Sequence, residues 1–237
     1  MPQSSSAVVM VAVGENRFAD LNLAPWRTVS DSWGVDFLII DRASREVPTR
    51  SDYNWRAFHK FDVLDLFSSY SRILRIDADT LPVPGSRSPF GLSEKAIWAR
   101  REGGILDRTL AKKRRKEFSR VQEILGNVGH TDHYFNSGVV LCGRDDAEIF
   151  RLDLSDQELV ELPGQFKEQS YLNWRIRQLN LPLRDFGPRF NRFPKDSFPK
   201  HKASILHYAG RQETKQEAME ADFLTFWSPL LGSQGRN

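Results

Sequence analysis

Cysteine and long apolar runs are both scarce in this sequence. Cys142 is the only cysteine among 237 residues, which excludes a disulfide framework and a cysteine-based zinc cluster. It ends an apolar run at residues 139–142, so we expect a buried, inert thiol. The longest early apolar run, at 7–13, has seven residues, whereas about 20 are needed to span a bilayer. This run also lacks a basic leader. We therefore expect no signal peptide and a cytoplasmic protein, with a peripheral position at the inner face of a membrane left open.

Charge of one sign is not abundant either, because 34 basic and 31 acidic residues leave a net charge of +3. Among the basic residues, 24 are arginine and 10 are lysine. Guanidinium groups bind phosphate and carboxylate oxygens in a two-pronged geometry that an ammonium group cannot match. The excess of arginine at a small net charge therefore predicts local anion sites rather than a uniformly basic surface. With 40% apolar and 11% aromatic residues the chain can fill a sizeable core, which excludes wholesale disorder.

Apolar segments and helical patterns alternate along the first 80 residues. Continuous, β-branched apolar segments are typical of strands that are buried on both faces. The sequence predicts three such strands, at residues 7–13, 35–41 and 72–76. Helices are predicted at 16–33, where Pro25 should kink or split the helix, and at 53–69. This order indicates linked βαβ units and therefore an α/β fold, with a mixed, mostly parallel central sheet flanked by helices.

Regular patterns are less continuous in the rest of the chain. Two proline-rich segments, at residues 81–92 and 184–199, are predicted as a loop and as irregular structure. The other predicted elements are strands at 96–99, 135–141 and 204–207 and helices at 107–125 and 168–179. No internal repeat is evident in the sequence, and a chain of this length is expected to form one domain.

Two carboxylates follow the third predicted strand directly. Asp77 and Asp79 flank Ala78 at the carboxyl end of that strand, the edge at which α/β sheets bind ligands. A turn that leaves the strand could bend both side chains toward one point. Hard divalent cations bind through one or two such carboxylates together with substrate phosphate. The alternative is a turn with a helix-capping aspartate, since Thr80 and Pro82 follow. From these residues alone both interpretations stay open.

Four short segments carry a resemblance to a known family. Residues 72–80 (RILRIDADT) resemble the D-x-D segment of nucleotide-sugar glycosyltransferases of the GT-A (Rossmann-like) fold. The segments 135–139 (FNSGV), 169–173 (QSYLN) and 205–210 (ILHYAG) resemble the F-N-S-G-V, D-Q-x-x-L-N and H-x-x-G elements that follow it in the same order. The combination is most similar to glycosyltransferase family 8, the group of glycogenin and the bacterial galactosyltransferases. The resemblance implies one GT-A domain over residues 1–237, with a nucleotide-binding half at about 7–100 and an acceptor half at about 101–215.

The resemblance also implies a metal-dependent transferase that moves a sugar from a nucleoside-diphosphate donor, expected to be a UDP-sugar, to a hydroxyl acceptor. Asp77, Asp79 and His207 would be its metal ligands. Two carboxylates and an imidazole suit Mn²⁺ or Mg²⁺, and such an ion neutralises the departing diphosphate as a Lewis acid. Without the resemblance, His207 is more simply explained as a core histidine at the end of a strand.

The donor is expected to contact several parts of the chain. Gly14 follows the first predicted strand and lets the backbone approach a nucleotide, although a plain strand-to-helix turn is the alternative. A G-x-x-x-x-G-K phosphate loop is absent from the sequence. Arg56 and Lys60, one helical turn apart, are either donor contacts or solvated cations. Arg211 is the candidate clamp for the diphosphate, with Lys215 beside it, because the family's Lys-Pro-Trp is absent here. The donor-binding candidates are Val13, Gly14, Asn16, Arg17, Arg56, Lys60, Ala78, Gly210 and Arg211.

Polar residues of the second half are the catalytic candidates on the acceptor side. They are Asn136, Glu168, Gln169 and Asp132. The family often has aspartate before this glutamine, so the carboxylate that stabilises the oxocarbenium-like centre is either Glu168 or Asp132. Similarity to family 8 implies front-face attack with retention of the anomeric configuration. An inverting enzyme would instead need a carboxylate base near the acceptor hydroxyl. A sugar-1-phosphate nucleotidyltransferase is less favoured, because residues 14–17 lack a long glycine-rich segment followed by lysine.

The most concentrated positive charge runs from Lys112 to Lys116 (KKRRK). Five consecutive cations on a helix cannot share one face, so most of them should be solvated. An anionic acceptor and a weak contact with an anionic membrane surface stay open as their partners. A nucleic-acid-binding module is a further alternative, although nucleic acid is not expected as a partner. The acceptor itself is expected to be a saccharide, lipid-linked or protein hydroxyl.

Overall fold

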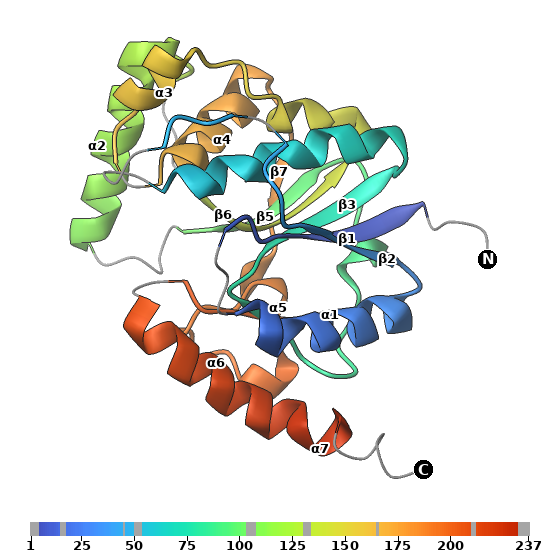
Figure 1. Ribbon diagram of the computed structural model, residues 1–237. Coiled ribbons are helices and arrows are strands. Elements are labelled where there is room, and N and C mark those ends of the chain that lie inside the picture. Colours follow the sequence, from blue (N-terminus) through green and yellow to red (C-terminus); the bar gives the residue numbers. More distant parts are fainter. Residues whose placement is uncertain are drawn as a thin grey trace.

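A central sheet of six strands carries helices on both of its faces (Figure 1). The computed structural model describes residues 5–14, 18–44, 46–49, 54–102, 108–129, 134–164, 166–209 and 212–231. The sheet consists of β1 (Ser6–Val11), β2 (Asp36–Ile40), β3 (Arg72–Asp77), β5 (Ile97–Arg101), β6 (Phe135–Gly143) and β7 (Leu183–Asp185). A second sheet pairs β4 (Thr80–Pro82) with β8 (Ile205–His207).

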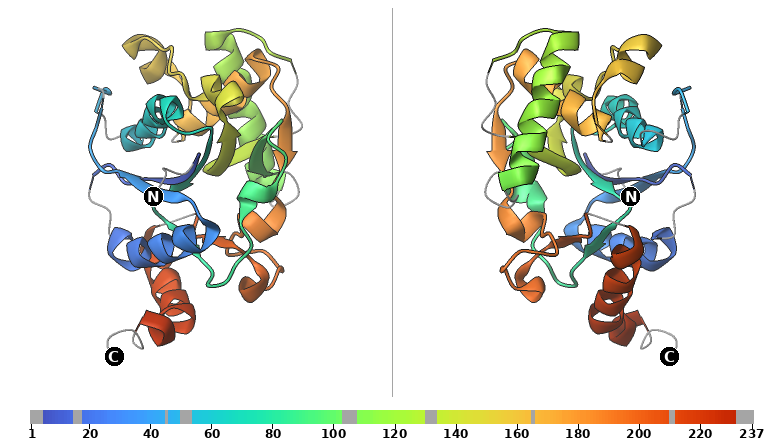
Figure 2. Two further views of the ribbon diagram at one scale, coloured as in Figure 1. Left: turned by 90° about the vertical axis from the view of Figure 1, so that its right-hand side faces the viewer. Right: turned by 90° about the vertical axis from the view of Figure 1, so that its left-hand side faces the viewer.

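Helices of two kinds cover the central sheet. The α-helices are α1 (Ala19–Trp33), α2 (Arg108–Leu125), α3 (Asp156–Glu161), α4 (Lys167–Gln178), α5 (Gly187–Phe190), α6 (Gln212–Phe226) and α7 (Ser228–Leu231). The 3-10 helices are η1 (Trp55–Ser68), η2 (Pro89–Gly91), η3 (Arg144–Phe150) and η4 (Lys200–Lys202). Figures 1 and 2 show α2, α3 and α4 on one side of the sheet and α1, α5 and α6 on the other.

The strand order in the central sheet is β2-β1-β3-β6-β5-β7. β1 pairs in parallel with β2 and β3, and β7 pairs in parallel with β5. β6 is antiparallel to both of its neighbours, β3 and β5. The prediction of a mixed, mostly parallel sheet flanked by helices is therefore confirmed. Because β1 and β3 run in the same direction, their carboxyl ends meet at one edge of the sheet.

Both faces of the sheet are buried, as the continuous apolar strands predicted. Neighbouring side chains of β3 point to opposite faces, so Ile73 belongs to the core that includes Tyr171 of α4, and Leu74 to the core that includes Trp26 of α1. Cys142 is fully buried in β6, and burial raises the pKa of its thiol well above the ordinary value. The expected buried thiol is confirmed. No helix in the described ranges is long and apolar enough to cross a membrane.

Several local predictions are wrong. The helix predicted at 53–69 is present as η1, but it is a 3-10 helix, and residues 57–63 within it are all buried. α1 continues across Pro25, so the predicted split is wrong, and the kink at this residue stays a prediction. The predicted loop at 81–92 contains most of β4 and all of η2, and the predicted irregular segment at 184–199 contains α5. β4 forms because it pairs with the distant β8, a partner that no local pattern reveals.

Candidate functional site

The pairing of β4 with β8 brings the three predicted metal ligands together. β3 ends at Asp77, and after a short turn Thr80 begins β4 directly opposite His207. The backbone N–H of Tyr208 donates to the carbonyl oxygen of Asp79 at 2.9 Å. Asp77, Asp79 and His207 can each offer one ligand atom, and these atoms lie within 4.8 Å of one another. Two residues that are two positions apart in the sequence and a third that is far from them therefore share one site.

Side chains of α1 hold the turn between β3 and β4. The amide of Asn22 donates to the carbonyl oxygen of Ala78 and, at 3.1 Å, to that of Thr80. The indole N–H of Trp26 also donates to the Thr80 carbonyl, at 3.2 Å. The Thr80 hydroxyl donates back to the Asp77 carbonyl at 2.7 Å. A strand rather than a helix follows this turn, so the alternative of a helix-capping aspartate is wrong.

Asp79 lies between a lysine ammonium group and a histidine ring. The Lys215 ammonium lies 2.6 Å from Oδ2, and Nε2 of His207 lies 3.4 Å from Oδ1. Burial alone would raise the pKa of Asp79, but His207 and Lys215 outweigh it and hold this pKa well below its usual range. The carboxylate therefore stays ionised near neutral pH, as a cation ligand must.

Asp77 is held by two buried cations. Nη1 of Arg75 donates to Oδ1 at 2.5 Å, and the Lys60 ammonium donates to Oδ2 at 2.9 Å. Lys60 also donates to Oε1 of Glu168 at 3.1 Å and to the Ser137 hydroxyl at 3.4 Å. Burial would lower the pKa of Lys60, yet the charges of Asp77 and Glu168 raise it above the ordinary value. Lys60 is thus no solvated cation, but a charge that joins β3 to α4.

Some buried polar atoms in this charge cluster lack a hydrogen-bond partner within the described part of the chain. They are Nε and Nη2 of Arg75 and Oε2 of Glu168. Arg75 itself is fully buried. Most buried polar atoms in proteins form hydrogen bonds. Unpaired donors and an unpaired acceptor in one cluster therefore indicate a place where polar groups of a ligand would find hydrogen-bond partners. Sequence analysis missed Arg75, although an arginine within a continuous apolar strand was a usable signal.

Gln169 and Asn136 connect the cluster to Glu102, the residue that follows β5. Oε1 of Gln169 accepts from the backbone N–H of Ser137 at 3.1 Å and from Nδ2 of Asn136 at 3.3 Å. Nε2 of Gln169 donates to Oε1 of Glu102 at 3.1 Å. Glu102 in turn lies 3.4 Å from Nε of Arg114 on α2. Glu102 was not singled out in the sequence, and Arg114 was considered only as part of the basic run at 112–116.

The His207 imidazole is enclosed by three groups. Its Nδ1 lies 3.0 Å from Oδ1 of Asn191, and its ring centroid is 5.5 Å from that of Phe193. Gly138 of β6 lies against the ring so closely that an added Cβ would meet Cε1 at 2.0 Å. The position of the imidazole is therefore fixed before any ligand is considered. Asn191, which is fully buried, carried no signal in the sequence.

Replacement of Gly138 by alanine is expected to displace His207, because the new methyl group and the ring cannot occupy the same space. We expect Gly138→Ala to weaken Mn²⁺ binding about tenfold or more, measured by isothermal titration calorimetry. Gly91→Ala is the matched control, since nothing lies within 4 Å of its added Cβ. Wild-type Mn²⁺ affinity in Gly138→Ala would contradict a ligand role for His207.

The candidate donor residues lie in different surroundings. Gly14, with a φ of +94°, follows β1, and an added Cβ there would meet Nε of Arg56 at 2.5 Å. Arg56 is exposed, and its guanidinium lies 5.2 Å from the centre of the Trp55 ring. Val13 is half-buried and Ala78 buried. The candidates Asn16, Arg17, Asp132, Gly210 and Arg211 lie outside the described residues.

The basic run on α2 divides into two sets. Arg114 turns inward, where it contacts Glu117 at 3.1 Å and lies 5.3 Å from the centre of the Phe166 ring. The side chains of Lys112, Lys113, Arg115 and Lys116 are exposed. The expectation that most of the run faces solvent is confirmed.

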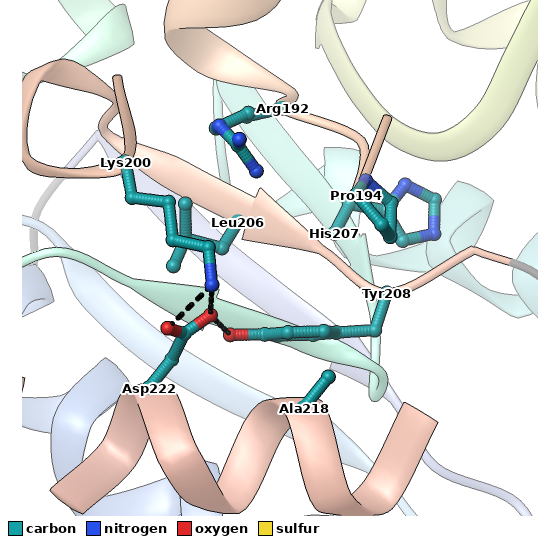
Figure 3. A pocket seen from close by; sticks show the side chains of 8 residues that line it. All are labelled: Arg192, Pro194, Lys200, Leu206, His207, Tyr208, Ala218 and Asp222. Carbon is teal, nitrogen blue, oxygen red and sulfur yellow. Dashed lines mark hydrogen bonds and ion pairs between the residues drawn. The ribbon is translucent and has the colours of Figure 1, made fainter. Parts of the chain in front are cut away.

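A cavity of about 60 Å³ adjoins His207 and is closed on one side by α6 (Figure 3). Asp222 of α6 accepts hydrogen bonds from Lys200, at 2.7 and 2.8 Å, and from the hydroxyl of Tyr208 at 2.8 Å. Burial, together with the charge of Asp222, raises the pKa of Tyr208 above its ordinary value, so its hydroxyl remains a donor. These bonds fasten α6, the helix that carries Lys215, to the strand that carries His207.

Solved glycosyltransferases share this fold. One, involved in the glycosylation of the major capsid of PBCV-1, has a TM-score of 0.57 and 15% identity, covering 91% of this chain and 98% of its own. The galactosyltransferase LgtC, solved with donor and acceptor sugar analogs, has a TM-score of 0.57 and 16% identity over 93% and 94% of the two chains. The bifunctional WbbM has a TM-score of 0.55 and 15% identity over 89% of this chain and 47% of its own.

These likenesses confirm the GT-A fold that the sequence predicted. No protein-family model and no curated protein matches the sequence significantly. At 15–16% identity the structural similarity concerns the fold alone, and membership of family 8 stays a prediction.

Proposed function

We propose that this chain is a metal-dependent glycosyltransferase that moves a sugar from a UDP-sugar to a hydroxyl group. One observation carries the proposal: Asp77, Asp79 and His207 converge at the carboxyl end of β3. This edge is where α/β sheets bind ligands. Solved structures with the same fold are described as glycosyltransferases, one of them a galactosyltransferase, which supports the reading. The proposed enzyme uses one GT-A domain, with the donor half at about 7–100 and the acceptor half at about 101–215.

The residues present fit a divalent metal ion. Asp77 and Asp79 offer hard oxygen ligands and His207 an imidazole nitrogen, a set that suits Mn²⁺ or Mg²⁺. Asp79 stays anionic because His207 and Lys215 hold its pKa below the usual range, against the effect of burial. When bound, the ion would neutralise the charge of the departing diphosphate as a Lewis acid. Lys215, next to Asp79, supplies a further positive charge for that diphosphate.

The donor nucleotide is proposed to lie along the loop after β1. Gly14 and Arg56 lie against each other at this edge and offer an open backbone and a guanidinium group. Val13, Asn16 and Arg17 follow β1 in the sequence, Ala78 lies in the turn between the proposed ligands Asp77 and Asp79, and Gly210 and Arg211 precede α6 in the sequence. Guanidinium groups suit the two-pronged recognition of phosphate oxygens, so Arg211 is the proposed diphosphate clamp.

The buried charges around Glu168 suit the reacting sugar. Glu168 is 2% exposed, and its Oε2 carries no hydrogen bond from the described residues. A carboxylate in this setting would stabilise positive charge at the anomeric carbon, which favours front-face attack with retention. Gln169 and Asn136 lie next to it and offer amide groups to sugar hydroxyls. Asp132 is the second candidate carboxylate. An inverting reaction would need one of these two groups as the base that takes the proton of the acceptor hydroxyl.

The acceptor is proposed to be a saccharide, lipid-linked or protein hydroxyl. The exposed cations of α2 are available to an anionic acceptor or to an anionic membrane surface. Both partners are anionic, so electrostatic attraction favours them equally.

A panel of nucleotide sugars, each with and without Mn²⁺, tests the proposed function. The cognate UDP-sugar at about 100 times its Kd should stabilise the protein by about 2.7 kcal/mol. For a chain of this size that raises the Tm by roughly 5–10 °C.

UDP should be released slowly even without an acceptor, EDTA should stop the release, and added Mn²⁺ should restore it. The absence of both responses for every nucleotide sugar, with Mn²⁺ and with Mg²⁺, would contradict the proposal. Proton NMR of the product anomer separates retention from inversion.

A further inference from the structure

A chain of side-chain amides runs through the site from Glu102 to His207. It consists of Gln169, Asn136 and Asn191, and each amide contacts the next. Glu102, Asn136, Gln169, Asn191 and His207 are each at most 8% exposed, so protein atoms rather than bulk water set their hydrogen bonds. The chain joins the candidate metal ligand on β8 to the candidate acceptor side on α4.

Backbone N–H groups fix which way two of these amides point. The N–H of Gly138 donates to Oδ1 of Asn136 at 2.9 Å, and the N–H of Ser137 donates to Oε1 of Gln169 at 3.1 Å. Because a backbone N–H can only donate, both acceptor atoms must be oxygens. The NH₂ group of Asn136 then faces Oε1 of Gln169, and the NH₂ group of Gln169 faces the carboxylate of Glu102. Every contact so far pairs a donor with an acceptor.

The requirement that each donor faces an acceptor extends the series of hydrogen-bonded amides to His207. Oδ1 of Asn136 can only accept, so the NH₂ group of Asn191 is the side that faces it, at 3.5 Å. Oδ1 of Asn191 therefore faces Nδ1 of His207 at 3.0 Å. A carbonyl oxygen only accepts, so the hydrogen in this bond belongs to Nδ1. In the neutral ring Nε2 then carries a lone pair, and it faces Oδ1 of Asp79 at 3.4 Å.

The segment that carries Asn191 is firmly anchored. Nη1 of Arg100 donates to the backbone oxygen of Asn191 at 2.6 Å. The same guanidinium binds the carboxylate of Asp196 through two hydrogen bonds, of 2.5 and 2.8 Å. The N–H of Arg192 donates to the carbonyl of Ile205 in β8, at 3.0 Å. Asn191 and His207 are thus held on two segments that are bonded to each other.

We infer that Asn191 is a positioning residue that selects the Nδ1–H form of His207 and thereby keeps Nε2 free to bind a cation together with Asp79. The role of Nε2 as a cation ligand rests on the proposed function, whereas the hydrogen-bond geometry around Asn191 and His207 does not. A lone pair and a carboxylate that face each other share no hydrogen in the neutral ring, and a cation bound between them would interact favourably with both. The same chain fixes the orientation of Gln169 on the acceptor side.

Mn²⁺ affinity, measured by electron paramagnetic resonance titration, tests the inference independently of turnover. Asn191→Leu removes both the acceptor for His207 and the donor to Asn136, and it should weaken Mn²⁺ binding by about 10- to 100-fold. Asn191→Asp keeps an acceptor for Nδ1 and should restore affinity to within about threefold of wild type. Thermal melts of both variants establish that they are folded. A folded Asn191→Leu protein with wild-type Mn²⁺ affinity would overturn the inference.

Long-range ¹H–¹⁵N correlation NMR of the metal-free wild-type protein tests the inference even if a variant fails to fold. At pH 8.5 we expect the His207 ring, assigned by comparison with His207→Gln, to show a protonated Nδ1 and an unprotonated Nε2. The opposite form would overturn the inference whatever the enzyme does. If the ring and the Mn²⁺ data are as expected but no nucleotide sugar is cleaved, the proposed function fails and the role of Asn191 stands.

Discussion

Asp79→Asn is expected to reduce Mn²⁺-dependent release of UDP from the cognate UDP-sugar by about 1,000-fold, which corresponds to about 4 kcal/mol in the activation barrier. The substitution removes the negative charge of the carboxylate, whose Oδ1 faces His207 and whose Oδ2 faces Lys215, while it keeps the shape of the side chain. Without that charge the site loses one of its two hard ligands and attracts a divalent ion less strongly. Steady-state UDP release at saturating Mn²⁺, together with an Mn²⁺ titration, measures both effects.

Asp65→Asn is the matched control for this experiment, because Asp65 is an exposed carboxylate on η1. It should retain activity to within about twofold, as surface substitutions usually leave a protein unchanged. Circular dichroism of Asp79→Asn should match that of the wild type, since the backbone bonds of the turn do not involve this carboxylate. Full activity and unchanged Mn²⁺ affinity in Asp79→Asn would remove the basis for a metal centre at this position.

Lys60→Met should destabilise the protein by about 3 kcal/mol. The ammonium group of Lys60 lies between Asp77 and Glu168 in a buried setting. Its removal leaves two carboxylates that face each other without the cation that separates them. A methionine fills nearly the same volume, so the loss reports on charge rather than on packing. Urea unfolding monitored by tryptophan fluorescence gives the difference in the free energy of unfolding.

The effect of Lys60 should also depend on pH in one direction. The pKa of Lys60 is raised in the folded protein, so its stabilising contribution is complete below about pH 10.4, the ordinary value for lysine, and is lost at higher pH. The stability difference between wild type and Lys60→Met should therefore be constant near neutral pH and shrink above that value. Lys95→Met, at an exposed position, should change stability by less than about 0.5 kcal/mol. Equal stabilities of Lys60→Met and the wild type at pH 7 would contradict the proposed role of this charge.

Local sequence could predict the strands and the two aspartates of the site, because apolar periodicity and a D-x-D at a strand end are local features. It could not predict which faces of the molecule meet. His207 came to attention only through a resemblance, since its position beside Asp79 depends on the pairing of β4 with β8. Lys60 was equally consistent with a solvated cation, because burial by α4 does not appear in the local pattern around it.

Residues that orient other side chains of the site could not be predicted from local sequence. Asn191 lies in a segment predicted to be irregular, and nothing in its neighbours distinguishes it from a loop asparagine. Its importance arises from three hydrogen bonds to distant segments. Glu102 is similar, because its partner Gln169 is remote in the chain. A charge within an apolar strand, such as Arg75, is the one signal of this kind that a sequence offers.

The pairing of β4 with β8 determines when the proposed metal centre can form during protein synthesis. These strands pair Thr80 with His207, so the third ligand leaves the ribosome long after the first two. At about 5–20 residues per second, the intervening chain takes roughly 6 to 25 s to make. During that interval β1, β2 and β3 can already pair, while the nascent chain holds two carboxylates but no imidazole to complete the set. A ribosome-bound chain that stops before β8 would therefore lack the third ligand of the proposed metal centre, and the proposed activity would begin only after the C-terminal part has been added.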